Sequence, residues 1–426
     1  MNRAIFLGLI AYALLLAALL SLHGEMLLLV IPVGLFLLAG TWRSPRELRL
    51  EATRSLSTER ALPDAPVQIM VTIRNRGEEL DEVFLQDLVP ARLKVVDGSP
   101  CALVRLERGA TQVLSYSVQG PRGGYAFEAV TAEANEDLGL SGRHGRMQVR
   151  NQLFVFPTVT RLRHITIRPR RTRVYAGNIP ARAGGNGIEF FGVRDYQPGD
   201  SSRSINWRVS ARHIGTLYSN EFQQERVADV GIVLDGRLRT NALGREHSLF
   251  EHSIQAAASL ADAFLFQGNR VGLLLYSNFL AWTYPDYGKV QRERILQALA
   301  RAQPGDSQVF TALEYIPTRL FPPESQIVVV SPLTEDDLLP LRKLRALGYQ
   351  VMVISPDPVS LEMSYLEHSP AVEMARRIVS MERRLLLQRA RRAGVQVMDW
   401  NIHQPLDLAV QKSLGRPPGW LQAIGS

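Results

Sequence analysis

Hydrophobic residues at the start of the chain form two uncharged runs, Ala4–Leu22 and Met26–Trp42, separated by a short turn. A helix needs about 20 apolar residues to cross a bilayer, and both runs approach this length. Arg3 precedes the first run and Arg43 follows the second, so the positive-inside rule places both ends in the cytoplasm. We predict a transmembrane hairpin over residues 1–46, with the remaining domains on the cytoplasmic side of the cell membrane. A cleaved signal peptide is the alternative.

Residues 47–157 follow a second pattern, in which hydrophobic and polar positions alternate with a period near two. Val67–Arg74 and Val113–Val118 alternate in this way, and Asn75-Arg76-Gly77 supplies the residues of a turn. Short alternating strands separated by turn residues are typical of an antiparallel sandwich. We therefore expect an all-β, immunoglobulin-like sandwich over this range.

Residues 227–426 follow a third pattern, in which apolar strands alternate with helical spacing. Val230–Leu234 and Val271–Tyr276 are continuous apolar runs, as expected of strands covered on both faces. This alternation predicts an α/β domain with a doubly wound parallel sheet, whose ligand chemistry lies at the carboxyl ends of its strands. Residues 158–226 are left as a linker between the two domains.

The most distinctive stretch lies within this linker. Pro198-Gly199 predicts a tight turn, because proline presets φ and glycine permits a positive φ. Asp200 is placed to pair with Arg194 or Arg203. Tyr196 and Trp207 are large side chains with polar groups, suited to locking one domain onto another.

This stretch resembles the hallmark of a bacterial and archaeal family named "domain of unknown function 58", approximately G-x-E-F-x-x-x-R-x-Y-x-P-G-D-x-x-R-x-I-x-W followed by A-R. The matching residues are Gly187, Glu189, Phe190, Arg194, Tyr196, Pro198, Gly199, Asp200, Arg203, Ile205, Trp207, Ala211 and Arg212. Asn206 stands where the family usually has Asp. The resemblance implies a von Willebrand factor A-like fold for the α/β domain. It also implies an accessory membrane protein with a MoxR-type AAA+ ATPase as partner, and it supplies no catalytic residue.

Metal-binding A domains place D-x-S-x-S after the first strand, where oxygen ligands hold Mg²⁺. Here the run Asp235-Gly236-Arg237-Leu238-Arg239 has arginines in place of both serines. Arginines are not metal ligands, and their charge repels Mg²⁺. We predict a degenerate site at Asp235, with no metal and no cofactor. Either Arg237 or Arg239 binds an acidic group of a partner beside Asp235, or Asp235 pairs with one arginine and only closes the strand end.

The charge balance adds two basic clusters. Of 426 residues, 49 are Lys or Arg and 41 are Asp or Glu, giving a net charge of +8. One cluster covers 161–173, and the other, 376–392, lies on a predicted helix whose apolar positions are Ala371, Met374, Ile378, Met381 and Leu385. Each cluster is read either as a contact with anionic lipid or as a solvated face. No base-reading motif accompanies the charge, so we expect no nucleic acid.

Signatures of known catalysts are missing from the sequence. It contains no G-x-x-x-x-G-K-[ST], no G-x-S-x-G and no H-E-x-x-H, and its single cysteine, Cys101, cannot form an internal disulfide. The leading hypothesis is a membrane-anchored, non-enzymatic adaptor or assembly factor that presents its A-like domain to a protein partner. The alternative is a metal-dependent ligand-binding or adhesion protein of the cell envelope, and a third option is an uncharacterised hydrolase.

Overall fold

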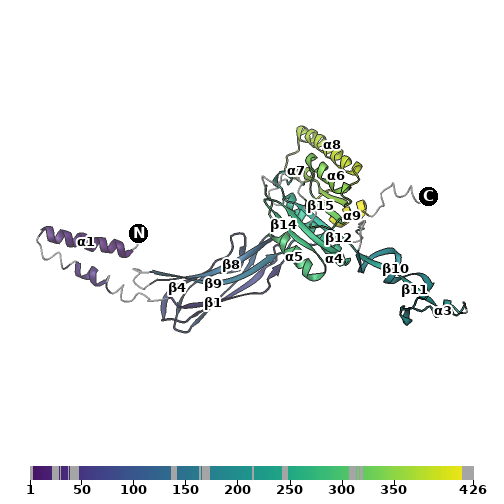
Figure 1. Ribbon diagram of the computed structural model, residues 1–426. Helices are drawn as coiled ribbons and strands as arrows, with labels where there is room; N and C mark the ends of the chain where they lie inside the picture. Colours follow the sequence, from purple (N-terminus) through teal and green to yellow (C-terminus); the bar gives the residue numbers. More distant parts are fainter. Residues whose placement is uncertain are drawn as a thin grey trace. The chain divides into compact units, whose positions relative to one another are not determined.

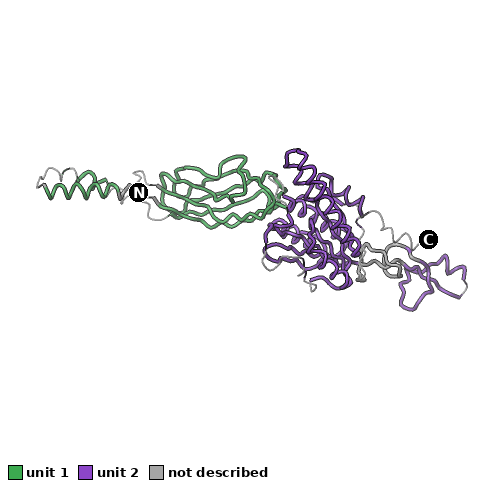
Figure 2. Tube along the Cα trace, turned by 90° about the horizontal axis from the view of Figure 1, so that it is seen from above, with its two compact units in different colours: residues 1–156 green, residues 157–426 purple. Residues whose placement is uncertain are grey.

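The computed structural model describes residues 3–21, 28, 30–36, 38, 48–135, 142–162, 165, 173–213, 215–241, 248–306, 313, 316 and 320–414. The chain divides into two compact units, Met1–Phe156 and Pro157–Ser426 (Figure 2). Each unit is described by itself.

The first unit begins with helix α1 (Arg3–Ser21). At a rise of 1.5 Å per residue its 19 residues, the first of them charged, span about 28 Å, less than the about 30 Å of a hydrocarbon core. Among the described residues, no helix has both the length and the apolar character that crossing a bilayer requires. The predicted transmembrane hairpin is therefore wrong. The multi-pass membrane location and the integral contact with the membrane, which depended on it, are wrong with it.

Two β-sheets follow α1 (Figure 1). The four-stranded sheet has the order β1-β3-β7-β5, formed by Leu50–Leu56, Val67–Asn75, Thr111–Gln119 and Lys94–Gly98. The five-stranded sheet has the order β2-β9-β8-β4-β6, formed by Arg60–Ala61, Gly142–Val155, Gly123–Asn135, Leu80–Asp87 and Cys101–Leu106.

A single apolar core lies between these sheets because alternate side chains of each strand point inward. In β3 the buried apolar residues are Val67, Ile69, Val71 and Ile73, and they join Leu85 and Phe127 of the other sheet in one cluster. The short strand β2 pairs with β9 in parallel. The expected fold, an immunoglobulin-like sandwich of antiparallel strands behind two membrane helices, is therefore wrong: no helix of the described residues has the character of a membrane span, and the two sheets that follow α1 include a parallel pair.

A buried ion pair joins the two sheets of this unit. Arg54 of β1 donates from Nε to Asp87 Oδ2 at the end of β4 over 3.0 Å, and Tyr116 Oη donates to the same oxygen over 2.6 Å. The Arg54 guanidinium also lies 5.1 Å from the centre of the Phe127 ring. Burial, together with the hydrogen bond to Asp87, raises the pKa of Tyr116. Three polar groups are therefore satisfied by one another inside an apolar core.

The second unit contains a six-stranded sheet of order β14-β13-β12-β15-β16-β17. Its strands are Leu280–Asp286, Arg270–Tyr276, Asp229–Asp235, Gln326–Val330, Gln350–Pro356 and Gln396–Trp400. All neighbours are parallel except β13 and the edge strand β14. The chain builds the sheet outward from β12 in one direction and then from β15 in the other, so the strand order reverses between them.

Helices cover both faces of this sheet (Figure 1). Helices α4 (Leu249–Phe266) and α5 (Gly288–Arg301) lie on one side, and α6 (Leu338–Ala346) and α8 (Pro370–Arg392) on the other. The shorter helices are α7 (Pro358–Met363) and α9 (Leu406–Leu414). Every residue of β12 and β15 is buried, which accounts for their continuous apolar sequences.

The predicted linker contains a two-stranded antiparallel sheet of β10 (Arg173–Asp195) and β11 (Tyr218–Val227). The chain between them forms a short 3-10 helix, η1 (Ser202–Ser204), and a single helical turn, α3 (Trp207–Ser210). We refer to β10, β11 and the residues between them as the hairpin.

Replacing Asp87 tests the ion pair between the sheets. Asp87→Ala leaves Arg54 buried without its carboxylate, so the free energy of unfolding should fall by about 3–5 kcal/mol in urea denaturation. Asp97→Ala in the exposed strand β5 is the control and should change it by less than about 0.5 kcal/mol. Equal effects of the two substitutions would contradict the role given to the pair.

Candidate functional site at the carboxyl edge of the sheet

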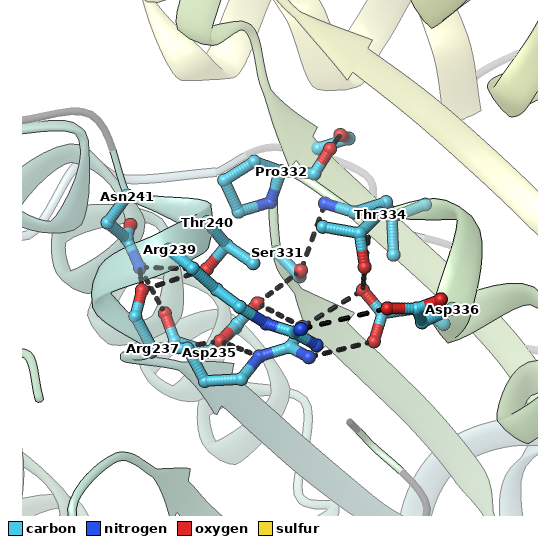
Figure 3. Close-up of polar contacts among 12 residues, drawn as sticks. Asp235, Arg237, Arg239, Thr240, Asn241, Ser331, Pro332, Thr334 and Asp336 are labelled. Atoms are coloured by element: carbon cyan, nitrogen blue, oxygen red, sulfur yellow. Dashed lines mark hydrogen bonds and ion pairs between the residues drawn. The ribbon is translucent and has the colours of Figure 1, made fainter. Parts of the chain in front are cut away.

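The carboxyl edge of the six-stranded sheet is where the strand order reverses, and such reversals create the crevice in which doubly wound sheets bind ligands. Asp235 ends β12 and Ser331 directly follows β15. Two 3-10 turns continue from these strands: η2 (Leu238–Thr240) after β12 and η4 (Glu335–Asp337) after β15. Figure 3 shows the polar side chains that converge here.

One guanidinium bridges two carboxylates at this edge. Arg237 donates from Nε and Nη2 to the two oxygens of Asp235 over 2.9 and 2.8 Å. It donates from Nη1 and Nη2 to the two oxygens of Asp337 over 3.0 and 2.9 Å. The side chain of Arg237 is 1% exposed and those of both carboxylates are 0% exposed. Burial opposes the charge, but the carboxylates outweigh it and hold the pKa of Arg237 above its usual value.

Further donors complete the surroundings of both carboxylates. Asp235 also accepts from Ser331 Oγ over 2.6 Å and from the backbone N–H of Arg237 over 3.0 Å. Asp337 also accepts from the backbone N–H and the hydroxyl of Thr334, each over 2.9 Å. Asp235 thus accepts two hydrogen bonds on each oxygen, and Asp337 accepts three on Oδ2 and one on Oδ1. We refer to Asp235, Arg237 and Asp337 as the arginine bridge.

Local sequence folds the loop after β12 so that Arg237 points back to the strand. A Cβ at Gly236 would lie 3.1 Å from the Phe250 ring and 3.2 Å from Ser277, so only glycine fits there without displacing a neighbour. Asn241 donates from Nδ2 to the carbonyls of Asp235 and Arg237 over 3.1 and 2.8 Å. The loop is therefore closed on its own backbone.

This donor set does not fit a divalent cation. Metal ligands must offer free lone pairs, and those of Asp235 and Asp337 already accept hydrogen bonds from a positively charged group. Arg237 and Arg239, the two positions compared above with the serine ligands of metal-binding A domains, are cations.

The three residues singled out for partner binding differ in accessibility. Asp235 and Arg237 are buried and paired with each other, as in the simpler of the two sequence interpretations. Arg239 is 40% exposed, and its Nη1 lies 3.6 Å from Asp336 Oδ2. Sequence reasoning did not assign Asp337 to this site. The sequence signal that could have identified Asp337 is the capping box Thr334-Glu335-Asp336-Asp337, in which Thr334 and Asp337 bind each other's backbone N–H groups.

A second arginine ties the neighbouring strand ends. Arg383 of α8 donates to the carbonyl of Pro332 over 3.0 Å, to Ser355 Oγ over 3.0 Å and to Asp399 Oδ1 over 2.8 Å. Its Nε lies 3.2 Å from Asp357 Oδ1, and the side chain is 9% exposed. Arg383 belongs to the basic cluster 376–392, for which the sequence predicts either a contact with anionic lipid or a solvated face. The structure instead places it among backbone carbonyls that need donors.

In the hairpin, Asp200 organises the turn that follows β10. It accepts from Arg194 Nη2 over 2.7 Å and from the N–H of Gln197 over 3.0 Å, and Tyr196 Oη donates to its carbonyl over 3.3 Å. Pro198-Gly199 lies in this turn, with φ of +110° at Gly199. Arg194, rather than Arg203, is the partner found for Asp200.

The remaining motif residues are distributed along the hairpin. Gly187 and Glu189 lie in β10, Arg203 and Arg212 are exposed, and Phe190 is 59% exposed. Trp207 is 66% exposed, so within the described part of the chain it does not act as the buried anchor that its size suggested. Asn206, which replaces the family's Asp, caps α3 by accepting from the N–H of Val209 over 3.0 Å. Its amide also donates to Asn220 Oδ1 over 2.8 Å, which a carboxylate could not do.

Residues 192–363 match the family model described as "Protein of unknown function DUF58". This range contains most of the hallmark and the whole arginine bridge, and it supports the resemblance found in the motif. The chain is also 24% identical over 336 residues to the uncharacterized protein YeaD of Bacillus subtilis (strain 168), covering 77% of this chain and 81% of YeaD.

Solved structures align with parts of the chain at low similarity. The CARDB domain of the PF1109 protein from Pyrococcus furiosus has 13% identity and a TM-score of 0.18, covering 25% of this chain and 93% of that domain. A FixG-related protein from Vibrio parahaemolyticus has 9% identity and a TM-score of 0.18, covering 25% of this chain and 95% of that protein.

Removing the guanidinium should destabilise the second unit. Arg237→Ala leaves two buried carboxylates unneutralised, so we expect the free energy of unfolding to fall by about 3–5 kcal/mol, measured by urea denaturation. Arg239→Ala, in the same turn but exposed, should cost less than about 1 kcal/mol. A loss as small as that of the control would mean that the bridge does not hold the strand ends.

The turn at Asp200 should respond to acid. The hydrogen bond from Arg194, followed by that from Gln197, holds the pKa of the Asp200 carboxyl below its usual range. The contribution of the Asp200 carboxylate to the stability of the turn is therefore complete at pH values above the usual pKa range of an aspartate. It is lost as the pH falls through the lowered pKa of Asp200. Carboxyl ¹³C NMR of Arg194→Gln should show the pKa of Asp200 rising.

The Glu373 carboxyl provides the internal control in the same titration. Its hydrogen bonds with Arg376 and Arg377 lower its pKa to about 2, and Arg194→Gln should not move it. An unchanged pKa of Asp200 in this variant would count against the pair.

Proposed function

We propose that this protein is a non-enzymatic adaptor that binds a protein partner through exposed residues around the carboxyl edge of its α/β domain. The proposal rests above all on the arginine bridge, which fills the ligand position of a doubly wound sheet with the chain's own side chain. The carboxylates at this edge are buried and paired with Arg237, so they are not free to hold a metal or to exchange protons with a substrate. Recognition by the exposed surface is the role that such an edge retains.

We further propose that the α/β domain is von Willebrand factor A-like and that its partner is a MoxR-type AAA+ ATPase. The strand order with one antiparallel edge strand, and an aspartate at the end of the central strand, support the A-like assignment. The resemblance of the hallmark motif supports the choice of ATPase. Arg239 and Asp336, beside the closed bridge, are exposed charged groups that a partner can reach.

Binding of a purified MoxR-type ATPase to the full chain, followed by biolayer interferometry, tests this proposal. Arg239→Glu reverses a charge at the proposed contact and should weaken binding at least tenfold. Lys289→Glu is the matched control, because it makes the same change in charge at an exposed residue. Residue 289 follows the end of β14, which lies beside the start of β13 and so at the amino edge of the parallel strands. No binding by the unaltered chain, or equal effects of the two variants, would refute the proposed contact.

Calorimetry with Mg²⁺ separates this proposal from a metal-dependent binding protein. We expect no stoichiometric uptake of Mg²⁺ by the chain alone. Uptake that disappears in Asp235→Asn would overturn the adaptor proposal.

A further inference from the structure

Helix α8 presents its apolar stripe to solvent and its polar side to the domain. A surface helix of a globular domain ordinarily does the reverse, because burying the apolar stripe is what holds the helix in place. Arg376, Ser380 and Arg383 lie on the less exposed side of α8, which continues into the buried residues Leu387 and Ala390. Its attachment to strands β15–β17 therefore depends on the hydrogen bonds of Arg383 as well as on its last turns.

The exposed stripe consists of four large residues. Met374 is 60% exposed, Ile378 53%, Met381 58% and Leu385 49%. Their spacing of four, three and four residues is that of a heptad seam, with Ile378 and Leu385 at a positions and Met374 and Met381 at d positions. Over this length, about 16 Å, the stripe matches the narrow contact line between two packed helices. Large apolar side chains exposed in one continuous stripe indicate an interaction site.

The charges beside this seam indicate what packs on it. Arg377 and Arg384 occupy the g positions, and Glu382 is the acidic residue at an e position. Charges at e and g positions select the partner of a helix pair. Two parallel copies of α8 would bring Arg384 against Arg389 but Arg377 against Glu382, and two antiparallel copies would bring Arg384 against Arg377, so self-pairing gains nothing from these charges. The flanking arginines instead complement acidic residues.

We propose that the exposed seam of α8 is a docking site for an acidic amphipathic helix of a protein partner. This inference rests on the proposed adaptor function and assigns it a second contact of defined chemistry. The seam binds the partner's apolar stripe, and the flanking arginines bind its carboxylates.

The test uses the full chain and a synthetic helical peptide of three heptads, labelled with fluorescein, with Leu at a and d and Glu at e and g. A twin peptide carries Lys at e and g. Fluorescence anisotropy should show binding of the acidic peptide at least tenfold tighter than binding of the basic one. Ile378→Asp combined with Met381→Asp should weaken binding of the acidic peptide at least tenfold. The matched control is Val290→Asp on α5, which alters an equally exposed apolar residue and should leave binding unchanged.

A charge-reversed variant makes the test independent of folding. Arg377→Glu combined with Arg384→Glu should bind the basic peptide better than the acidic one, which a merely unfolded helix would not do. Arg239→Glu should leave peptide binding unchanged, so the failure of the ATPase contact and the failure of this docking site are distinguishable. Equal binding of both peptides, or no effect of the two aspartates, would overturn the proposal. A dimer of the full chain, seen by light scattering and abolished only by the double aspartate variant, would also overturn the proposal. Sedimentation of the chain with anionic vesicles, abolished only by the same variant, would overturn it as well.

Discussion

The Arg237 guanidinium between Asp235 and Asp337 is the interaction on which the carboxyl edge of the α/β domain depends. It joins the turn after β12 to the turn after β15, the two parallel central strands of the sheet. The cluster holds two negative charges and one positive charge, so one negative charge remains. That charge lies at the N-terminal end of α6, where the helix dipole favours an anion. A site of this kind is stable only when all of its members are present, since each buried charge is satisfied by the others.

The sequence predicted the course of the strands far better than the contacts between them. Continuous apolar runs such as Val230–Leu234 indicated strands β12, β13, β15, β16 and β17, because burial on both faces favours an apolar side chain at successive positions. The absence of a D-x-S-x-S pattern at Asp235 was visible as well. Asp337 was not assigned, because it lies about 100 residues further along the chain and only folding brings it to Asp235. The two uncharged N-terminal runs predicted two membrane spans. This prediction was wrong, because no helix of the described residues has both the length and the apolar character of a span.

Side-chain orientation was the weakest part of the sequence interpretation. Trp207 has the size of a core anchor but begins a short helical turn on the surface. Arg383 has the charge of a surface residue but is mostly buried against backbone carbonyls. In both cases the local backbone decides the outcome. Residue type alone gives the average behaviour of a side chain, and these two positions depart from it.

A cation carried on the polypeptide differs from a bound ion in one important respect. Its local concentration is fixed by the covalent chain, so neither chelators nor competing metals nor dilution can remove it. The strand ends are therefore assembled as soon as the domain folds, and the surface around them has the same form whatever the mineral content of its surroundings. The availability of metal ions therefore does not change this surface.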